Sequence, residues 1–375
     1  MTKNISIKFL AVAILCLLAG IGQVFAQAGN GSITGVVTDS NGAIIPNAAV
    51  KLVSLSKGTE LTTTASSDGI YNFTSLEPGN YSVTASGGGF AEQKLEVQVQ
   101  VGRTTDANFT LGAGNVAAEV IVTAEGVQTT QSNSDAVLSE TAIENLPING
   151  RRFQDFATLT PTAQIDTERN QISLSGQRGI NANINVDGVD YNQPFFGGIR
   201  GGERSNFAPT IPQESIKEFQ VVAAGYNAEY GRSTGGIVNV VTKGGTNRFR
   251  GSAFFLTRPD KFSVNHDYVT RLEEANNLDI VAAPTQNQFG GSFGGPIVKN
   301  RLFFFGSYEQ QKFTADRFVL FTGLDSVTVT PANAQAINYY RSLETQYQLT
   351  NDAKTALGRI DWNINDSNSI NFRYS

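Results

Sequence analysis

The last third of the chain alternates long and short gaps between strand-like segments, and this spacing constrains the fold more than any other feature. Outer-membrane β-barrels have strands of roughly 9–11 residues, short periplasmic turns and longer extracellular loops. The candidate strands, separated by long, short, long and short gaps, are residues 248–258, 286–295, 301–312, 354–364 and 368–375. This spacing predicts part of a transmembrane β-barrel wall. Because about five strands cannot close a barrel and lipid does not tolerate open sheet edges, we interpret the chain as the N-terminal fragment of a larger membrane protein.

The final predicted hairpin separates apolar from polar side chains. Successive side chains of a strand point to opposite faces. One face carries Ala356, Gly358, Ile360, Trp362 and Ile364, followed after the turn by Ile370, Phe372 and Tyr374. The other carries Leu357, Arg359, Asp361, Asn363 and Asn365, followed by Asn371, Arg373 and Ser375. We expect the first face to meet outer-membrane lipid and the second the lumen, although a soluble antiparallel sheet with one wet face gives the same pattern.

Length and charge narrow the classes of function. A chain of 375 residues has room for two or three domains. Its net charge of −5 argues against a nucleic-acid-binding protein, because such proteins usually carry a basic patch. After the N-terminal segment, no apolar run is long enough for a transmembrane helix.

The first 26 residues have the pattern of a secretory signal peptide. The pattern consists of Lys3 and Lys8, an apolar core at residues 9–20 and a small-residue cleavage site at residues 24–26. Cleavage after Ala26 would leave Gln27 first, and a retained membrane anchor is the alternative. Cys16 lies in the apolar core, so the expected mature chain has no cysteine and no thiol chemistry.

Residues 30–112 show the short strands and turn signals of a small all-β sandwich. They resemble the carboxypeptidase regulatory-like domain, a transthyretin-like sandwich classed with carbohydrate-binding-like folds. The resemblance is carried by Gly35-Val36-Val37-Thr38-Asp39, Gly42 with Pro46, Ser67-Asp68-Gly69-Ile70-Tyr71 and Leu76-Glu77-Pro78-Gly79-Asn80-Tyr81. A zinc peptidase needs several metal ligands, and the chain's single histidine, His266, lies far from this segment. We therefore expect a spacer and no peptidase activity.

Residues 113–133 form a linker rich in small residues, with one β-forming run. That run is Glu119-Val120-Ile121-Val122-Thr123. Such a segment can add as a strand to the edge of a partner's sheet, where backbone hydrogen bonds supply affinity. An ordinary strand packed against the next domain is the alternative.

Residues 134–246 have the mixed pattern of a compact α+β domain. Helices are expected at residues 140–146 and 151–159, and a helix start near residues 212–215. Strands are expected at Glu218–Val222 and Ile237–Thr242, and a tight turn at Asp187-Gly188.

This region resembles the plug domain of TonB-dependent outer-membrane receptors. The matching pieces are Leu146-Pro147 with Arg151-Arg152-Phe153, Val186-Asp187-Gly188-Val189, Ile216-Lys217-Glu218-Phe219-Gln220-Val221, and Glu229-Tyr230-Gly231-Arg232 with Gly235 to Lys243. The following runs NRFRGSAFF and FGGSFGGPIVKNRLFFFGSYEQQ are similar to early barrel strands of the Oar-like subgroup, which also carries a leading regulatory-like domain. The expected order is signal peptide (1–26), sandwich (30–112), linker (113–133), plug (134–246) and partial barrel (248–375).

The resemblance implies a barrel of about 22 strands closed by the plug. It implies that a substrate binds outside the cell and crosses the outer membrane with energy relayed by TonB of the TonB–ExbB–ExbD complex. TonB pairs with a short segment called the TonB box, which Glu119, Val120, Ile121, Val122 and Thr123 resemble. The run lacks a diagnostic box sequence, and a sandwich ahead of it departs from the simplest receptors. The extracellular ligand implied is a siderophore, glycan, peptide or protein.

Three places are candidates for ligand or plug contacts. A Gly-rich loop carries Phe195, Phe196, Arg200, Glu203 and Arg204, which either contact substrate or belong to a loop with no ligand role. Long surface loops are expected near residues 259–285 and 313–353, and loops on a rigid scaffold usually carry binding. The polar barrel residues Arg359, Asp361, Asn363 and Arg373 either face the plug or line solvated lumen.

Two functions compete: transport by a TonB-coupled receptor, and adhesion or structural support on the same barrel. An enzyme is not expected, since no nucleophile–base set, metal cluster or phosphate loop stands out in the sequence. No cofactor and no metal is expected for the same reason.

Overall fold

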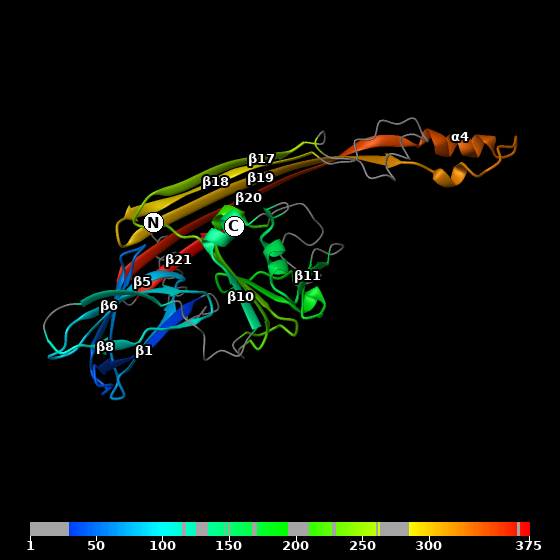
Figure 1. Cartoon of the computed structure of the whole chain (residues 1–375). Coiled ribbons are helices and arrows are strands. Elements are labelled where there is room, and N and C mark those ends of the chain that lie inside the picture. Colours follow the sequence, from blue (N-terminus) through cyan, green and yellow to red (C-terminus); the bar gives the residue numbers. More distant parts are fainter. Residues whose placement is uncertain are drawn as a thin grey trace, which may run out of the picture.

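The protein is mainly β (Figure 1). It forms three units: a β-sandwich, a smaller α+β unit and a five-stranded antiparallel sheet. The structure, a computed structural model, describes residues 30–114, 118–124, 134–146, 148, 151–166, 171–193, 210–226, 230–259, 262, 285–365 and 368–375. The predicted signal peptide and most of the predicted loop at residues 259–285 lie outside these residues. In the described part of the chain, no helix is both long and apolar enough to cross a bilayer.

The first unit is a sandwich of two sheets. Its strands are β1 (Gly31–Asp39), β2 (Ala49–Ser54), β3 (Glu60–Thr64), β4 (Ile70–Leu76), β5 (Gly79–Ser86), β6 (Gln93–Val99), β7 (Thr104–Asp106), β8 (Phe109–Leu111) and β9 (Ala118–Ala124). One sheet has the order β4-β1-β7, with β8 also pairing with β1, and the other has the order β3-β2-β5-β6-β9. Alternate residues of each strand point inward, as the strand period requires.

The sandwich core is self-contained. Its buried side chains run from Ile33 to Leu111 and include the ring pair Tyr71 and Phe109, whose centroids are 6.0 Å apart. Gly35 is required beside this pair, because a Cβ there would lie 1.9 Å from the carbonyl oxygen of Ala107. The Tyr71 hydroxyl donates to that same carbonyl oxygen, so the buried polar group has a partner.

The second unit, which we call the plug, is formed by the elements between Ser134 and Thr242. Its elements are β10 (Ser134–Leu138), α2 (Glu140–Asn145), η2 (Phe153–Leu159), β11 (Ala163–Asp166), β12 (Gln171–Leu174), η3 (Gly179–Asn181), β13 (Asn183–Val186), β14 (Val189–Asp190), η4 (Gln213–Ser215), β15 (Ile216–Ala224) and β16 (Ile237–Thr242). The main sheet has the order β10-β15-β16-β13-β14.

The predicted plug elements occur, with two differences in helix type, one of which is that the helix start expected near residues 212–215 is a short 3₁₀ helix, η4, followed directly by β15. Ser139 caps α2 by accepting a hydrogen bond from the Ala142 amide, and β16 has the expected bounds. The segment predicted as a helix at residues 151–159 is a 3₁₀ helix, η2, that begins two residues later. Arg151 has a φ of 51°, outside the right-handed helical region, so a helix cannot start there.

The third unit, which we call the barrel sheet, has five antiparallel strands in the order β17-β18-β19-β20-β21. The strands are β17 (Arg250–Arg258), β18 (Thr285–Val298), β19 (Leu302–Val319), β20 (Thr345–Asn365) and β21 (Asn368–Tyr374). The sheet forms a long curved layer, and the plug and the sandwich both lie on one side of it (Figure 1). The expected alternation of long and short connections is confirmed by these bounds.

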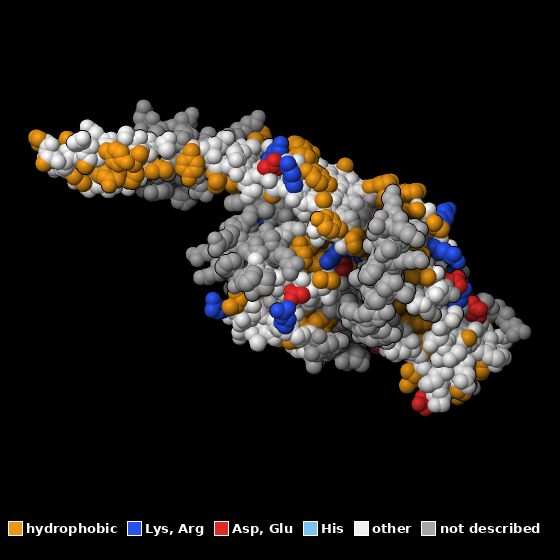
Figure 2. Space-filling view, turned by 180° about the vertical axis from the view of Figure 1, so that it is seen from behind, with side chains coloured by type: hydrophobic (Ala, Val, Ile, Leu, Met, Phe, Trp, Pro, Cys, Tyr) orange, Lys and Arg blue, Asp and Glu red, His pale blue; other side chains and the backbone are white. Residues whose placement is uncertain are grey.

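The two faces of the barrel sheet differ as the sequence predicts. Ile360, Trp362 and Phe372 are 45%, 49% and 64% exposed on the outer face. Leu357, Arg359 and Asp361 on the opposite face are 3%, 7% and 3% exposed. Hydrophobic side chains are spread along the outside of this sheet (Figure 2). The apolar outer face therefore suits contact with lipid.

The prediction of a surface loop at residues 313–353 is partly wrong. The β19–β20 ladder continues beyond the predicted strand ends to the pair Val319 and Thr345. These flanks are rich in Phe, Tyr, Val and Thr, which favour extended structure. The connection at the tip holds η6 (Thr322–Leu324) and α4 (Ala334–Ser342), and the whole hairpin projects beyond the plug (Figure 1).

Replacement of Phe109 by Ala in an isolated segment of residues 30–112 tests whether the sandwich core stands alone. The wild-type segment should melt cooperatively, because its core needs no residue from the plug or the barrel sheet. Phe109→Ala should destabilise it by about 3–5 kcal/mol. Thr110→Ala is the matched control, since Thr110 is exposed, and should change stability by about 0.5 kcal/mol or less. Thermal melts followed by circular dichroism measure both, and equal effects would contradict the assignment of Phe109 to the core.

Candidate functional site: a charged junction of sandwich, plug and barrel sheet

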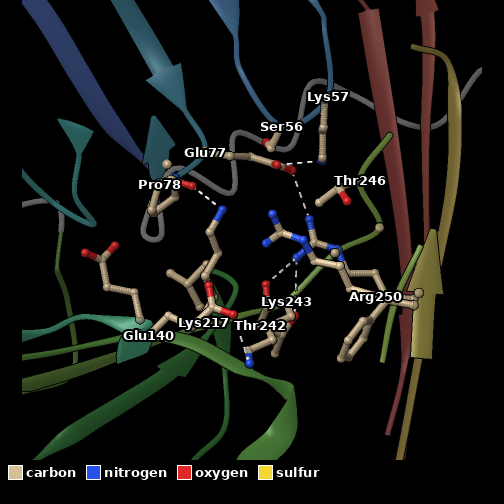
Figure 3. A pocket seen from close by; sticks show the side chains of 18 of the residues that line it. Ser56, Lys57, Glu77, Pro78, Glu140, Lys217, Thr242, Lys243, Thr246 and Arg250 are labelled. Carbon is tan, nitrogen blue, oxygen red and sulfur yellow. Dashed lines mark hydrogen bonds and ion pairs between the residues drawn. The ribbon is translucent and has the colours of Figure 1, made fainter. Parts of the chain in front are cut away.

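Charged side chains from the sandwich, the plug and the barrel sheet meet beside a cavity of about 1110 Å³ (Figure 3). The sandwich contributes the turns that follow β2 and β4, which carry Lys57 and Glu77. The plug contributes Lys217 from β15 and the end of β16, and the barrel sheet contributes Arg359 from β20. Because these elements are far apart in sequence, the junction exists only when all three units are folded together.

Glu77 bridges the sandwich and the barrel sheet. Its two carboxylate oxygens accept from Lys57 Nζ at 2.6 Å and from Arg359 Nη2 at 2.9 Å. Burial alone would raise the pKa of Glu77, but the nearby Lys57 and Arg359 cations hold that pKa well below its usual range. Glu77 is therefore a carboxylate at any physiological pH.

Arg359 contacts all three units at once. Besides Glu77 of the sandwich, its guanidinium donates to Asp361 Oδ1 at 2.8 Å and to the Thr242 carbonyl oxygen of the plug at 3.0 Å. Lys57 Nζ lies 3.5 Å from Asp361 Oδ2 and completes the group. A buried guanidinium is tolerated because its donors have acceptors, and it holds those acceptors in a fixed geometry.

The tight turn at Asp187-Gly188 brings a second carboxylate to the barrel sheet. Both turn residues have positive φ, 48° and 77°, which suits Asp and Gly. Asp187 accepts from the Thr242 amide at 2.8 Å and from Arg373 Nη1 at 2.7 Å. This confirms that Arg359 and Arg373 face the plug.

Two other predicted lumen residues have different partners. Asp361 contacts Arg359 and the sandwich residue Lys57, as described above. Asn363 donates to the Asn300 carbonyl oxygen in the β18–β19 turn at 3.5 Å, so it belongs to the barrel's own turn.

A second set of contacts joins the sandwich directly to the plug. The Val101 amide donates to Glu218 Oε2 at 2.8 Å, and Arg103 makes two hydrogen bonds of 3.0 Å to Asp135. Lys217 Nζ donates to the Pro78 carbonyl oxygen. Burial raises the pKa of Glu218 to about 7 and lowers the pKa of Lys217. Unlike Glu77, Glu218 thus changes charge near neutral pH.

The plug meets the barrel wall again around Arg151. Arg151 Nε donates to Glu309 Oε1 of β19 at 3.2 Å, and Arg151 Nη2 donates to Glu214 Oε1 at 2.8 Å. Its guanidinium also lies over the Phe254 ring of β17, 3.8 Å from the centroid. The fully buried Glu309 accepts a further hydrogen bond from the Gln213 amide. Polar contacts therefore form part of the boundary between plug and barrel wall, and Phe305 of β19 and Leu357 of β20 add apolar contacts with the plug core.

The predicted coupling segment lies in the sandwich. Glu119, Val120, Ile121, Val122 and Thr123 form most of β9, which pairs in parallel with β6. The segment is a strand, and its role in coupling stays a prediction. The substrate-contact candidates Phe195, Phe196, Arg200, Glu203 and Arg204 lie outside the described residues.

Sequence reasoning missed the residues that join the units. Glu77 and Lys217 stood in the sequence only as parts of matching runs, and Lys57 was not singled out. The Glu-Pro-Gly turn at Glu77 is a weak signal of the junction, because the neighbouring residues do not indicate which distant cation the carboxylate contacts. In the described part of the chain, no group of three or more His, Cys, Asp or Glu is placed to hold a metal ion.

Two known domain families match parts of the chain. Residues 32–112 match the carboxypeptidase regulatory-like domain, and residues 241–327 match an outer membrane beta barrel domain. The chain is therefore an outer-membrane protein that combines these two domains, and the mainly β fold expected from the sequence is confirmed.

The chain is homologous to TonB-dependent transporters. It is 27% identical over 265 residues to the TonB-dependent transporter Oar of Myxococcus xanthus, which covers 66% of this chain and 24% of Oar. It is 25% identical over 209 residues to the probable TonB-dependent siderophore receptor PirA of Acinetobacter baumannii, which covers 51% of this chain and 24% of PirA. The chain thus spans about a quarter of the length of these curated relatives, which are named as transporters and receptors and not as enzymes.

Two solved structures are also similar. The siderophore receptor PirA from Acinetobacter baumannii matches with 22% identity and a TM-score of 0.43, covering 66% of this chain and 31% of that one. The outer membrane transporter YddB from Escherichia coli matches with 14% identity and a TM-score of 0.45, covering 62% of this chain and 31% of that one.

Replacement of Glu218 by Gln tests the contact between sandwich and plug. Because burial raises the pKa of Glu218 from 4.5 to about 7, its stabilising effect is fully present below pH 4.5 and is lost as the pH rises through about 7. Hydrogen–deuterium exchange at Val101 in the full-length protein should therefore become faster relative to the Glu218→Gln variant between those pH values. Identical pH profiles for the two proteins would contradict the buried contact.

Replacement of Arg359 by Met tests the junction itself. The variant removes Arg359, one of the two cations that Glu77 and Asp361 share, and leaves Lys57 in place; removing one partner of a buried ion pair costs up to about 3–5 kcal/mol. Arg301→Met is the matched control, because Arg301 is exposed in the β18–β19 turn. Urea unfolding of the full-length proteins in lipid vesicles measures both variants, and equal stabilities would show that the junction contributes little.

Proposed function

We propose that this protein is a TonB-dependent outer-membrane receptor that binds a substrate at the cell surface and moves it across the outer membrane with energy relayed by TonB. The proposed organisation is a signal peptide (1–26), a periplasmic sandwich (30–112), a connecting segment (113–133) whose coupling residues join the sandwich sheet as β9, the plug (134–246) and the first barrel strands (248–375). Homology to TonB-dependent transporters supports the general class.

The observation that carries the proposal is the charged boundary between plug and barrel sheet. A transporter plug must be stable at rest and must also move or rearrange to open a path. Arg151, Arg359 and Arg373 hold the plug against the wall with hydrogen bonds that water can replace one at a time. An apolar boundary of the same size would expose its whole area to water on opening.

The position of the coupling segment also supports the proposal. Residues Glu119 to Thr123 precede the first plug strand, β10, so a pull on this strand is applied to the start of the plug. The short β18–β19 connection at residues 299–301 lies near the sandwich, since Asn300 and the Lys57 carbonyl both contact Asn247. Short turns of outer-membrane barrels face the periplasm, so the sandwich and β9 fall on the side where TonB acts.

Substrate recognition would then fall to the opposite end of the sheet. The tip of the β19–β20 hairpin is ordered by contacts of Arg341 with Asp325 and Glu344 and by packing of Phe321 against Tyr340. Tyr339 and Tyr347 are 61% and 51% exposed there. Exposed aromatic side chains on a rigid support suit binding of a siderophore, glycan, peptide or protein.

The same hairpin favours a second candidate, a surface adhesion or structural protein on the barrel. A long arm with exposed aromatic side chains can hold another cell-surface molecule without any transport. The two candidates differ in their need for TonB, because an adhesin would keep its activity in cells that lack TonB.

Replacement of Ile121 by Pro tests the coupling segment. Proline removes a backbone N–H donor and fixes φ, so it should interrupt any strand formed with TonB and weaken binding of the purified TonB periplasmic domain by about tenfold or more. Ile121→Val is the matched control, because it keeps the N–H group and the β-branched side chain. Substrate accumulation in cells should fall for the Pro variant only, while surface binding of the substrate is unchanged.

Two results would contradict this assignment. Normal accumulation at wild-type expression would mean that coupling occurs elsewhere in the protein. Loss of surface binding together with accumulation would mean that the segment supports the structure of the receptor.

A further inference from the structure

The sandwich holds the segment that joins the plug to the barrel sheet. That segment, residues 243–249, which we call the connection, runs from the end of β16 to the start of β17. The Asn247 amide donates to the Ser56 carbonyl oxygen at 3.0 Å, and Asn247 Nδ2 donates to the Lys57 carbonyl oxygen at 2.7 Å. We propose that the sandwich turn at residues 55–58 is a clamp, which keeps the connection on the barrel wall and confines opening of the plug to its β10–β15 edge. The proposal rests on the proposed function, in which the plug opens.

The barrel sheet holds the same asparagine from a second side. Asn247 Nδ2 also donates to Asn300 Oδ1 at 2.6 Å, and the Asn300 amide donates to Asn247 Oδ1 at 2.8 Å. Both hydrogens of the Asn247 side-chain amide and its oxygen are therefore bonded, which fixes the side chain in one orientation. Asn247 thus ties the connection to the clamp and to the β18–β19 turn at once.

Gly58 allows the clamp to come this close to the other two segments. Its φ is 66°, which glycine adopts without strain. A Cβ at this position would also lie 2.5 Å from Asn300 Oδ1 and 3.0 Å from Asn247 Nδ2, so a larger residue would push against both side chains. The clamp therefore depends on a glycine for its backbone conformation and for its contact with the connection.

The connection also lies directly against the barrel wall. A Cβ at Gly245 would lie 2.5 Å from the Phe304 carbonyl oxygen and 2.7 Å from Phe303 Cβ, both on β19. Such a close approach of two backbones needs a residue without a side chain. Because the wall lies beside Gly245 and the clamp beside Asn247, movement of the connection would break contacts with both.

Lys57 joins the clamp to the charged junction. Its carbonyl oxygen accepts from Asn247, while its Nζ donates to Glu77 at 2.6 Å and lies 3.5 Å from Asp361 Oδ2. The Lys57 side chain is 12% exposed, so its charge depends on these two carboxylates. Ser56, Lys57 and Thr246 line the same cavity (Figure 3). Buried ion pairs therefore hold the clamp in place in addition to the neutral hydrogen bonds.

The clamp holds the plug at the middle of its sheet. The connection follows β16, the central strand of the order β10-β15-β16-β13-β14. At the β10–β15 edge the sandwich contacts the plug through the Arg103–Asp135 pair and the hydrogen bond from Val101 to Glu218. Parting at that edge breaks these contacts and leaves the connection in place, whereas departure of the whole plug requires the clamp to open as well. The sandwich therefore limits how far the plug can move.

Replacement of Gly58 by Ala tests the clamp in the full-length protein in lipid vesicles. Amide exchange in residues 243–249 should become about tenfold faster or more, because the added Cβ pushes against Asn247 and Asn300 and their hydrogen bonds are lost. Gly42→Ala is the matched control. Gly42 also lies in a sandwich turn with a positive φ, 82°, but a Cβ there would meet no described atom beyond its chain neighbours within 4 Å. The control should leave exchange in the connection unchanged.

Exchange in β5 shows whether the sandwich stays folded in each variant. Equal exchange of residues 243–249 in the wild type, Gly58→Ala and Gly42→Ala would overturn the proposal. If Gly58→Ala unfolds the sandwich, Asn247→Ala takes its place, because it removes the same side-chain hydrogen bonds without changing a sandwich residue. It should accelerate exchange in the connection to the same extent, and unchanged exchange would again overturn the clamp.

Native-state exchange at increasing urea concentration tests where the plug opens. In the wild type, residues 134–138 of β10 should open at a lower urea concentration than residues 237–249, and Gly58→Ala should bring the two midpoints together. Simultaneous opening in the wild type, or earlier opening of residues 237–249, would overturn the proposal. These measurements need neither substrate nor TonB. Failure of the clamp is therefore distinguishable from failure of the proposed transport, which the accumulation measurement on Ile121→Pro decides.

Discussion

The buried guanidinium of Arg359 is the interaction on which the arrangement of the three units depends. It is 7% exposed and bonds to the sandwich through Glu77, to the plug through Thr242 and to its own strand through Asp361. An unpaired charge at this depth would be very costly, so the sandwich and the plug have to be in place for β20 to keep Arg359 buried. The charge therefore makes the positions of the three units interdependent, in a way that a hydrophobic contact would not.

The two carboxylates of the sandwich boundary, Glu77 and Glu218, behave differently. Lys57 and Arg359 keep Glu77 ionised, so its link to the barrel sheet is insensitive to pH near neutrality. Glu218 accepts a hydrogen bond from the Val101 backbone amide, and burial raises its pKa to about 7. The Glu77 link of the sandwich to the barrel sheet therefore does not change near neutral pH, whereas one of the sandwich–plug contacts, at Glu218, does; the Arg103–Asp135 pair is a further sandwich–plug contact. This difference suits a sandwich that stays on the barrel sheet while the plug changes position.

The strand faces and the tight turn could be predicted from the sequence, because they depend on local periodicity and turn chemistry. The two-residue period of residues 356–365 correctly separated the outer face from the face that meets the plug, and the Asp187-Gly188 turn occurs as expected. The length of β19 and β20 was underestimated, because the two-residue alternation of apolar and polar residues is interrupted in the flanks, at Arg317 and Phe318 of β19 and at Asn351 of β20. The partners of Glu77, Lys217 and Glu218 were not predictable, because each lies on a unit that contacts it only through the tertiary fold. The pairing of β9 with β6 was missed for the same reason, since a five-residue β-forming run does not specify its neighbour.

The proposed coupling segment lies in strand β9 of the sandwich, and this gives the sandwich a proposed role beyond that of a spacer. A spacer ahead of the plug would need no contact with the plug, yet Val101 and Arg103 bond to it immediately after β6 ends. Strand β6 is paired with β9 at Gln93, Lys94, Glu96 and Val97 and leads directly into the plug contacts. A load on β9 reaches the plug at β10 through the chain itself and at β15 through Glu218. Because β10 and β15 are neighbours in the plug sheet, both routes act on the same edge of that sheet. The β10–β15 edge is therefore where opening of the plug would begin, while Arg151 and Glu309 still hold the plug to the barrel wall elsewhere.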